Sequence, residues 1–353
     1  MHTRGLVLTA PRELTLQAFE LPLLGPGDAR VRVAGCGVCH TDISFYTGQV
    51  RTRHPLPLVL GHEIAGTVVD AGPAFRALVG RDVIVPAVLP CSDCALCRSG
   101  HDNACLNQIM PGNHVHGGFA GEIVVPARHL VTLGADRGGY ALADLAVIAD
   151  AVTTPYQAIL RAGVARDEVV IVIGAGGIGT YAVQIARARG ARVAVVDVDA
   201  AKLERLAAFG VEWRFNPREI DGPAIRKRLA ADSGVAAAWK ILEMSGTLAG
   251  QELAWSLLVP AATLGIIGFT MDKPQVRLSN LMALDAQAFG SWGCSPSLYA
   301  EAIALVTSGQ VTLRPFIERR PIADGPALFA HLADSHAGAD RRAILVPDET
   351  EAL

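Results

Sequence analysis

The stretch EVVIVIGAGGIGTYAVQIARARG, residues 168–190, decides the fold class, because it contains an apolar strand, a glycine-rich turn and an amphipathic helix in direct succession. A second strand, ARVAVVDVD (191–199), and a second helix, AAKLERLAAFG (200–210), follow it. The later runs KILEMSG (240–246) and TLGIIGF (263–269) have apolar residues on both faces, which is typical of buried parallel strands. This alternation of strands and helices predicts an α/β fold with a doubly wound parallel sheet.

The sequence on either side of this region has a different character. Residues 1 to about 150 contain short strands separated by Gly and Pro, with examples at 29–39, 64–72, 81–88 and 121–127. A helical run at 297–309 and a strand at 341–347 are expected to return to this first domain. The sequence therefore predicts a β-rich domain at 1–151 and 292–353. A cofactor-binding domain at 152–291 is inserted in it, with the active-site cleft between the two.

Length and composition narrow the class of protein. A chain of 353 residues exceeds the usual size of one hydrophobic core. The net charge is −3 and no long basic run occurs, so a nucleic-acid partner is not expected. The N-terminus has no secretory apolar region, and no apolar run approaches the roughly 20 residues that span a bilayer. We therefore expect a cytoplasmic protein without a membrane partner, whose cysteines stay reduced.

The glycine-rich turn, GAGGIG, has the pattern of a dinucleotide-binding site. Asp197 lies 18 residues beyond it, near the spacing expected for a carboxylate that binds the ribose, and its charge favours NAD over NADP. Two alternatives remain: the turn binds no ligand, or Asp197 only caps the following helix. The predicted cofactor-binding residues are Gly174, Gly176, Gly177, Ile178, Gly179, Asp197, Lys202, Thr154 and Phe269.

Four of the seven cysteines lie within fifteen residues, in PCSDCALCRSGHDNACL (90–106). Four thiolates with this spacing can surround Zn²⁺ completely, which is typical of a structural site. A reducing compartment disfavours disulfides as the explanation. The predicted structural zinc ligands are Cys91, Cys94, Cys97 and Cys105.

A second group of metal-binding residue types lies upstream. Cys39 is in GCGVCHTD, and His62 and Glu63 are in GHE. Spacing alone leaves such a Cys–His pair as plausible in a core as on a metal. Together with the four-cysteine segment, GAGGIG and VVDVD, however, these motifs give the chain a resemblance to the zinc-containing medium-chain alcohol dehydrogenases over almost its whole length. The resemblance implies a GroES-like catalytic domain carrying two Zn²⁺ ions, and a Rossmann domain that binds NAD.

The resemblance also implies the ligands of the catalytic zinc. Cys39 and His62 match two of them, and the third is often a cysteine just before the Rossmann domain. Here the matching segment, ADAVTTPYQAI, offers Asp150 instead, and a carboxylate is an accepted zinc ligand. Alternatively Glu63 binds the metal, or Asp150 only caps the helix beginning near Thr153.

The resemblance assigns catalytic roles to the residues around Cys39. Asp42 is expected to orient His62 through its other ring nitrogen. Thr41 matches the hydroxyl residue that takes the first hydrogen bond from the substrate alcohol. Ser44 stands where many relatives have a histidine in the proton relay. Because serine is not a base, the proton is expected to leave through the ribose, water or His40, and His40 alternatively contacts the pyrophosphate.

A narrower resemblance concerns the substrate. It is carried by AGCGVCHTDIS, IVPAVLPCSDCALCRSG, CLNQIMPGN, GGFAGEIVVPAR and DAVTTPYQA. Together these segments resemble those of 6-hydroxycyclohex-1-ene-1-carbonyl-CoA dehydrogenases, which oxidise a ring secondary alcohol of a CoA thioester with NAD. Arg51, Arg53 and His54 form a small basic cluster that could bind the CoA phosphates, or belong to a merely solvated loop. The alternative substrate is a generic secondary alcohol or polyol.

Other classes of protein explain fewer features. An NAD-binding sensor without catalysis is possible if the catalytic metal site is empty, and it would hold one zinc rather than two. A zinc module for nucleic acids leaves GAGGIG unexplained, and a zinc-free quinone reductase leaves Cys39 and His62 without a role. The resemblance implies a homodimer or homotetramer.

Overall fold

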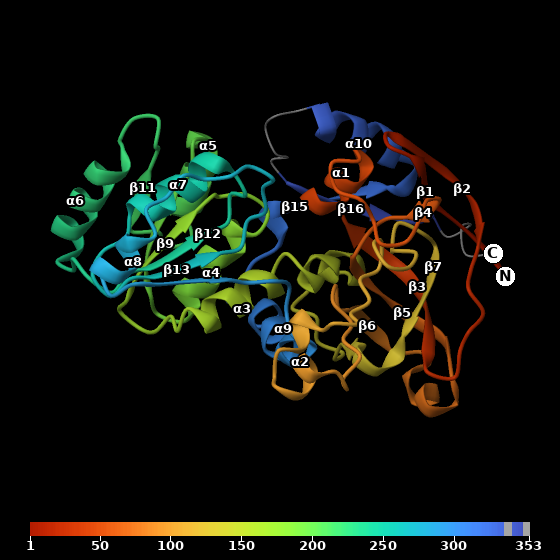
Figure 1. The fold of residues 1–353 in the computed structure, drawn as a ribbon. Coiled ribbons are helices and arrows are strands. Elements are labelled where there is room, and N and C mark those ends of the chain that lie inside the picture. Colours follow the sequence, from red (N-terminus) through yellow and green to blue (C-terminus); the bar gives the residue numbers. More distant parts are fainter. Residues whose placement is uncertain (335–340, 349–353) are drawn as a thin grey trace. The chain divides into compact units, whose positions relative to one another are not determined.

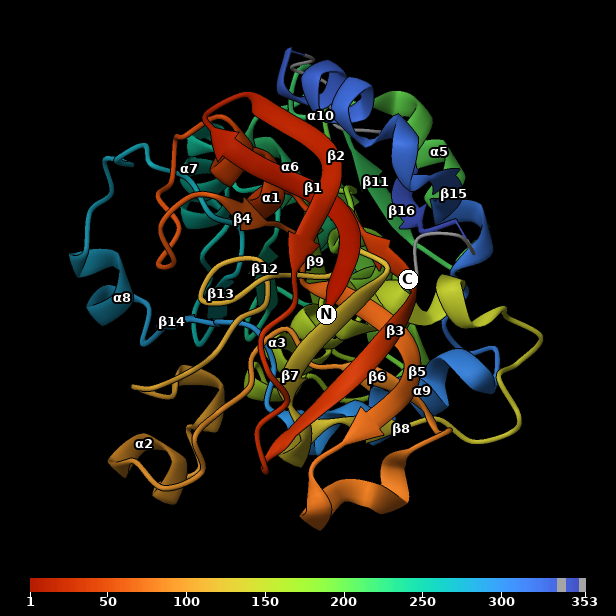
Figure 2. The same ribbon diagram turned by 90° about the vertical axis from the view of Figure 1, so that its right-hand side faces the viewer.

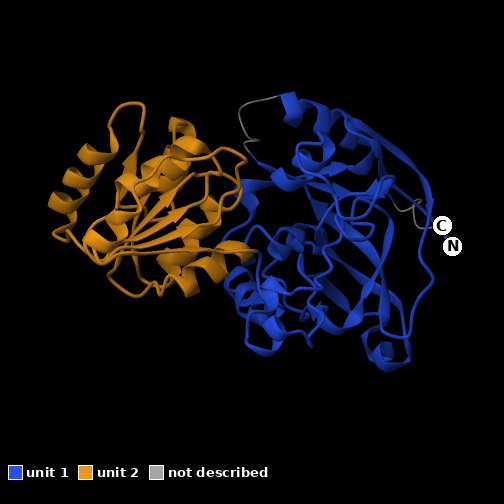
Figure 3. Ribbon diagram, in the orientation of Figure 1, with its two compact units in different colours: residues 1–153, 293–353 blue, residues 154–292 orange. Residues whose placement is uncertain are grey.

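The computed structural model describes residues 1–334 and 341–348, and the chain divides into two compact units (Figure 3). Unit 1 comprises residues 1–153 and 293–353, and unit 2 comprises residues 154–292. The boundaries predicted from sequence lie at 151/152 and 291/292. The parts of the predicted catalytic domain at 335–340 and 349–353 lie outside the described residues. Within the described ranges, no helix is both long and apolar enough to cross a membrane.

Unit 2 is built on a six-stranded sheet with the order β11-β10-β9-β12-β13-β14, in which every neighbouring pair is parallel. Figure 1 shows helices on both sides of this sheet, which confirms the predicted doubly wound fold. The strands are β9 Val169–Ile173, β10 Arg192–Val196, β11 Trp213–Phe215, β12 Lys240–Glu243, β13 Thr263–Ile266 and β14 Gln287–Gly290. The helices are α4 Gly179–Ala188, α5 Ala200–Ala207, α6 Gly222–Ser233, α7 Leu248–Ser256 and α8 Ser279–Ala283, and α3 Thr153–Arg161 begins at the unit boundary.

The strand β9 shows why these residues form a central strand. Its sequence, VVIVI, is β-branched throughout, and all five side chains are buried between layers of helices. The strand order reverses between β9 and β12, and in such sheets ligands bind beside the carboxyl ends of the strands at that point. The glycine-rich turn follows β9 directly, so the fold places it there.

Unit 1 contains a seven-stranded sheet with the order β15-β16-β3-β5-β6-β8, in which β7 also pairs with β3, and a three-stranded sheet β2-β1-β4. Its strands are β1 His2–Ala10, β2 Glu13–Glu20, β3 Asp28–Gly37, β4 Leu58–Val59, β5 Glu63–Ala71, β6 Asp82–Val85, β7 Glu122–Pro126, β8 Val131–Thr132, β15 Ile317–Pro321 and β16 Arg342–Val346. Its α-helices are α1 His40–Tyr46, α2 Ala95–Arg98, α9 Tyr299–Thr307 and α10 Gly325–Asp334. Its 3-10 helices are η1 Pro73–Leu78, η2 Asp102–Ala104, η3 Ala127–His129, η4 Leu142–Ala149, η5 Pro296–Leu298, η6 Arg314–Phe316 and η7 Ile322–Asp324.

The two sheets of unit 1 enclose one apolar core. Leu6, Ile64 and Phe119 are fully buried in it, and Phe329 from α10 packs edge-on against Phe119. The long strand β3 lies between β5 and β7, while α2 and its flanking loops project from these strands (Figure 2). The four clustered cysteines therefore lie on an appendage of the β-rich unit, outside its sheets.

Candidate functional site

Three segments far apart in the chain bring their ends together in unit 1. In the antiparallel pairing of β3 with β5, Gly37 lies opposite Glu63. Cys39 follows β3 as the N-cap residue of α1, and His62 directly precedes β5. Asp150 is the C-cap residue of η4, shortly before α3 begins. The fold thus brings together a thiol, an imidazole and a carboxylate that lie at the ends of three different helices and strands.

The donor atoms of these side chains are spaced as ligands of one ion. Oδ2 of Asp150 lies 3.7 Å from Sγ of Cys39 and 3.7 Å from Nε2 of His62. Ligand bonds of about 2.0–2.3 Å at tetrahedral angles separate neighbouring donor atoms by about 3.3–3.8 Å. Glu63 belongs to the same group, whose ligand atoms all lie within 4.8 Å of one another. The donor set therefore fits Zn²⁺, and the role of each residue as a ligand stays a prediction.

Asp42 contacts two members of this group, Cys39 and His62, through its carboxylate oxygens. Its Oδ2 accepts a hydrogen bond from the Cys39 amide at 2.9 Å, and its Oδ1 lies 3.2 Å from Nδ1 of His62 and accepts from the Gly61 amide. Burial alone would lower the pKa of His62, but the Asp42 carboxylate, with Asp150 and Cys39, raises that pKa well above its usual value. The same concentration of negative charge would attract a divalent cation to Nε2.

Glu63, the fourth member of the group, is fully buried. Its Oε1 forms an ion pair with Arg342 from β16. Burial raises the pKa of Glu63 to about 8, although the Arg342 guanidinium lowers it. Oε2 has no hydrogen-bond partner among the described residues. Glu63 therefore has a carboxylate oxygen available for a cation, and the alternative in which it binds the metal stays open.

The predicted relay residues differ in their placement. The hydroxyl of Thr41 lies 3.8 Å from Sγ of Cys39, beside the donor group. Ser44 is buried, and its hydroxyl donates to the carbonyl of His40 within α1 at 3.2 Å. His40 itself is exposed. Of the three, Thr41 is the one whose hydroxyl lies beside the donor group.

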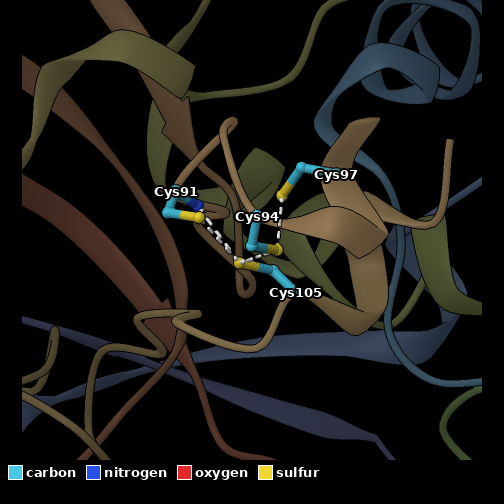
Figure 4. A group of neighbouring side chains, drawn as sticks. All are labelled: Cys91, Cys94, Cys97 and Cys105. Carbon is cyan, nitrogen blue, oxygen red and sulfur yellow. Dashed lines mark hydrogen bonds between the residues drawn. The ribbon is translucent and has the colours of Figure 1, made fainter. Parts of the chain in front are cut away.

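The four-cysteine lobe, residues 90–106, brings its sulfurs together (Figure 4). Sγ of Cys94 lies 3.5 Å from that of Cys97 and 3.8 Å from that of Cys105, which is 3.5 Å from Sγ of Cys91. Four thiolates bound tetrahedrally at about 2.3 Å would be about 3.8 Å apart. None of these cysteines forms a disulfide. The spacing fits a closed Zn²⁺ site with no position for substrate.

The pKa values of two of these thiols are shifted in opposite directions. The amides of Cys97 and Leu106 lower the pKa of Cys94 to about 6. Burial and the neighbouring sulfurs of Cys94 and Cys105 raise the pKa of Cys97 to about 12. Cys94 is therefore ionised easily and Cys97 is not, and a divalent cation bound by the four sulfurs would stabilise the thiolate of Cys97.

In unit 2 the glycine-rich turn has one open and two crowded positions. A Cβ on Gly174, where φ is +94°, would lie 2.7 Å from the backbone of Ser245, and one on Gly179 would lie 1.7 Å from the Gly174 carbonyl. Gly176 has no atom within 4 Å of its Cβ direction. Gly174 and Gly179 are thus required by packing, while Gly176 faces space that a pyrophosphate at the N-terminus of α4 could use.

Asp197 follows β10 beside this turn. Its Oδ2 accepts a hydrogen bond from the Ala175 amide at 2.6 Å, and its Oδ1 accepts from the Asp199 amide. The N-cap of α5 is Asp199, which accepts from the amides of Ala201 and Lys202. The alternative in which Asp197 only caps this helix is therefore wrong.

The other predicted cofactor residues are spread along unit 2. Thr154 is buried in α3, and Phe269 is 58% exposed after β13. Nζ of Lys202 lies 3.9 Å from Oδ2 of Asp199, one turn along α5. Cofactor contacts of these three residues remain predictions.

Comparisons with known proteins agree with this architecture. A profile described as "Alcohol dehydrogenase GroES-like domain" matches residues 25–135, and one described as "Zinc-binding dehydrogenase" matches residues 177–308. The galactitol 1-phosphate 5-dehydrogenase of Escherichia coli is 30% identical over 306 residues, which cover 83% of this chain and 85% of that protein. The chain belongs to the zinc-binding alcohol dehydrogenase family.

Other members of the family support the assignment. The L-galactonate-5-dehydrogenase of E. coli is 29% identical over 89% of this chain and 90% of its own length. A cobalt- and zinc-bound thermostable alcohol dehydrogenase from Pyrobaculum aerophilum has a TM-score of 0.84 and 26% identity, covering 98% of this chain and all of that one. The predictions of a GroES-like domain with a Rossmann-type domain, and of an enzyme that oxidises CH–OH groups, are confirmed.

The dehydrogenase contains one residue at the site that the sequence did not reveal. Arg342 reaches Glu63 because β16 pairs with β3, with Ile344 opposite Gly37. Its partner lies 279 residues away in the chain. No local pattern in the sequence signals such a contact.

Proposed function

We propose that the chain is a zinc- and NAD-dependent dehydrogenase that oxidises a secondary alcohol to a ketone. The convergence of Cys39, His62 and Asp150 within ligand distance carries this proposal. A zinc ion held there would act as a Lewis acid that lowers the pKa of the substrate hydroxyl. The four-cysteine lobe would hold a second, structural zinc.

Residues of the chain would bind the metal, orient its ligands and transfer the proton of the substrate hydroxyl. Cys39 and Asp150 supply two negative charges for the cation, and Asp42 keeps Nε2 of His62 directed toward it. The Thr41 hydroxyl, beside Cys39, would accept the hydrogen bond from the substrate and pass on its proton. Because the Ser44 hydroxyl is bonded to the helix backbone, the proton would continue through water, the ribose or His40.

The cofactor proposed for unit 2 is NAD, which would accept the hydride at its nicotinamide ring. The open position at Gly176 and the free end of α4 would receive the pyrophosphate. The Asp197 carboxylate, at the end of β10, would hydrogen-bond the ribose hydroxyls and repel the 2′-phosphate of NADP.

For the substrate we propose an alcohol that carries a phosphate-bearing group, specifically 6-hydroxycyclohex-1-ene-1-carbonyl-CoA. Arg51 and Arg53 are both exposed, and the Arg53 amide donates to the side chain of Asn113 at 2.8 Å, which fixes this loop. The loop thus offers cationic groups for the CoA phosphates.

A polyol is the second candidate substrate, because the relatives named above are dehydrogenases of L-galactonate and galactitol 1-phosphate. An NAD-reduction screen separates the two proposals. The cyclic hydroxyacyl-CoA, free cyclohexenol, galactitol and galactitol 1-phosphate are compared as substrates. Selective turnover of the thioester is expected, and comparable turnover of the free alcohols would favour the second candidate. Replacing Arg51 and Arg53 by Ala is then expected to raise KM for the thioester and leave KM for free cyclohexenol unchanged.

Metal analysis tests the catalytic centre itself. The enzyme is expected to hold two zinc ions per chain, and Asp150→Asn should hold one and lose turnover. Asp150→Cys restores an anionic ligand and is expected to recover the second zinc. One zinc in the unsubstituted, NAD-binding chain would instead indicate a sensor.

A further inference from the structure

The short segment Ser295–Tyr299 forms hydrogen bonds to residues beside both candidate metal sites of unit 1. We propose that Tyr299 is a positioning residue for Asp150, and that this segment makes the affinity of the catalytic metal site depend on the four-cysteine lobe. The inference rests on the proposed function, since it presumes that Asp150 is a metal ligand. Every residue involved belongs to unit 1.

The hydroxyl of Tyr299 is a junction between two backbone segments. Tyr299 has no exposed surface, and its hydroxyl donates to the Ala149 carbonyl at 2.5 Å and accepts from the Ala87 amide at 3.2 Å. The Thr153 hydroxyl donates to the same Ala149 carbonyl at 3.1 Å. Two hydrogen bonds therefore fix the peptide that joins Ala149 to Asp150, and with it the origin of the Asp150 side chain.

The same segment is hydrogen-bonded to residues near the first and the last cysteine of the lobe. Ala87, bonded to Tyr299, lies four residues before Cys91. At the other end, the Ser295 hydroxyl donates to Oδ2 of Asp102 at 2.9 Å, three residues before Cys105. Ser295 is also the N-cap residue of η5, which leads directly into α9 and Tyr299.

This arrangement gives a physical route between the sites. When its metal leaves, the lobe loses the cation that holds its four thiolates together. The backbone near Cys91 and Cys105 is then held less firmly, and so are Ala87 and Asp102, which lie close to these cysteines in the chain. Tyr299 and Ser295 are bonded to these two residues, so the constraint on the Ala149 carbonyl weakens. Asp150 then spends less time within reach of Cys39 and His62, and the affinity of the catalytic site falls.

The first experiment tests Tyr299 alone. With zinc in the lobe, Co²⁺ is titrated into the metal-depleted catalytic site and followed by its visible absorption. Tyr299→Phe keeps the ring and removes the hydroxyl, and is expected to weaken Co²⁺ binding about 10–100-fold, as loss of an orienting partner typically does. The matched control is Tyr140→Phe, which removes another buried hydroxyl, bonded to the Leu313 amide at 3.0 Å, and should leave Co²⁺ affinity unchanged.

The second experiment tests the connection. Ser295→Ala leaves every lobe cysteine in place, and Cys97→Ser empties the lobe; each is expected to weaken Co²⁺ binding at the catalytic site. In the Tyr299→Phe background their further effect should be smaller than in the unsubstituted chain, because both act through the same hydroxyl. If Cys97→Ser does not fold, Ser295→Ala gives the same comparison.

The outcomes separate this inference from the proposed function. If the unsubstituted protein binds no Co²⁺ at Cys39 and His62, both are wrong. If it binds Co²⁺ and Tyr299→Phe binds equally tightly, the positioning role of Tyr299 is overturned and the proposed function stands. If Tyr299→Phe weakens binding but the effects of the paired substitutions simply add, the connection to the lobe is overturned. A rise in Co²⁺ dissociation constant confined to Tyr299→Phe, Ser295→Ala and Cys97→Ser supports it.

Discussion

Asp42 is a buried carboxylate whose two oxygens serve three donors, the amides of Cys39 and Gly61 and the ring of His62. Asp42→Asn replaces one acceptor by an amide group that faces other N–H donors. We expect the catalytic site to lose about 10–100-fold in metal affinity, because the imidazole is no longer held in one orientation. Equilibrium dialysis with Co²⁺ measures this loss.

The control for Asp42 is Asp70→Asn, whose carboxylate binds the exposed Arg76 at 3.0 Å on the same unit. The metal affinity of the Asp70→Asn variant should equal that of the unsubstituted protein. Unaltered affinity in Asp42→Asn as well would show that the hydrogen bonds around His62 do not set its orientation.

Asp197 and Asp199 allow a sharp test of cofactor choice. Asp197→Ser removes the charge proposed to repel a 2′-phosphate, so the ratio of kcat/KM for NADP to that for NAD should rise at least tenfold. Asp199→Ala removes the cap of α5 and the carboxylate beside Lys202, which costs about 1 kcal/mol of stability and should leave the ratio unchanged. Equal ratios in both variants would contradict the assigned role of Asp197.

Residue patterns in the sequence predict only some of the residues of the candidate site. The four clustered cysteines stand out because their type is rare and their spacing is close, whereas Cys39 and His62 stand out only together with the other motifs of the family. Asp150 could be chosen only through resemblance, since an aspartate before a helix is ordinary. Arg342 and Tyr299 could not be predicted, because their contacts with Glu63 and Ala149 exist only after distant segments pack.

The glycine-rich turn gives two opposite outcomes for the same substitution. Gly179→Ala places a methyl group against the Gly174 carbonyl, so we expect a lower melting temperature or failure to fold. Gly176→Ala meets no protein atom and should melt like the unsubstituted protein, yet bind NAD at least tenfold more weakly. Calorimetry and fluorescence titration with NADH measure the two effects. Normal NAD affinity in Gly176→Ala would exclude this position as the pyrophosphate contact.

The lobe around α2 should bind zinc in a pH-dependent way. Cys97, with a pKa of about 12, must release a proton on binding zinc, whereas Cys94, with a pKa of about 6, is already ionised at pH 7. Protons therefore compete with the metal, and affinity should fall as the pH is lowered from 9 to 6. Competition with a chromophoric chelator measures it. Cys36→Ala, outside the lobe, should show the same dependence, and a constant affinity would contradict metal binding by these thiols.

Regular elements follow from the sequence where one residue type dominates. The apolar run of β9 predicts a buried parallel strand correctly, and α3 begins at Thr153 as expected. The helix predicted to end at Gly210 stops at Ala207, because the amides of Phe209 and Gly210 form tighter turns with the preceding residues. The pairing of β16 with β3 depends on packing over about 300 residues, and no local pattern encodes it.

At the scale of the whole molecule, unit 2 has features of an assembling surface. Its sheet ends in β14, which within the described residues pairs only with β13, and the nearby side chains of Leu278 and Met282 are 70% and 78% exposed. We expect a homodimer or homotetramer in sedimentation velocity. Leu278→Glu with Met282→Glu should shift it toward monomer, while Leu23→Glu, at a 92% exposed position of unit 1, should not. A monomeric unsubstituted protein would contradict this expectation.

The discontinuity of unit 1 has a consequence for how the protein is made. The chain leaves this unit at Thr153 and re-enters it at Gly293, and β16 is laid against β3 only by residues 342–346. On a translating ribosome the inserted domain is therefore complete while its host still waits for the segment that carries Arg342 and the strand beside Cys36. Until that last segment emerges, the thiols and the imidazole of the nascent chain lack their finished surroundings, so metal loading belongs to the end of synthesis.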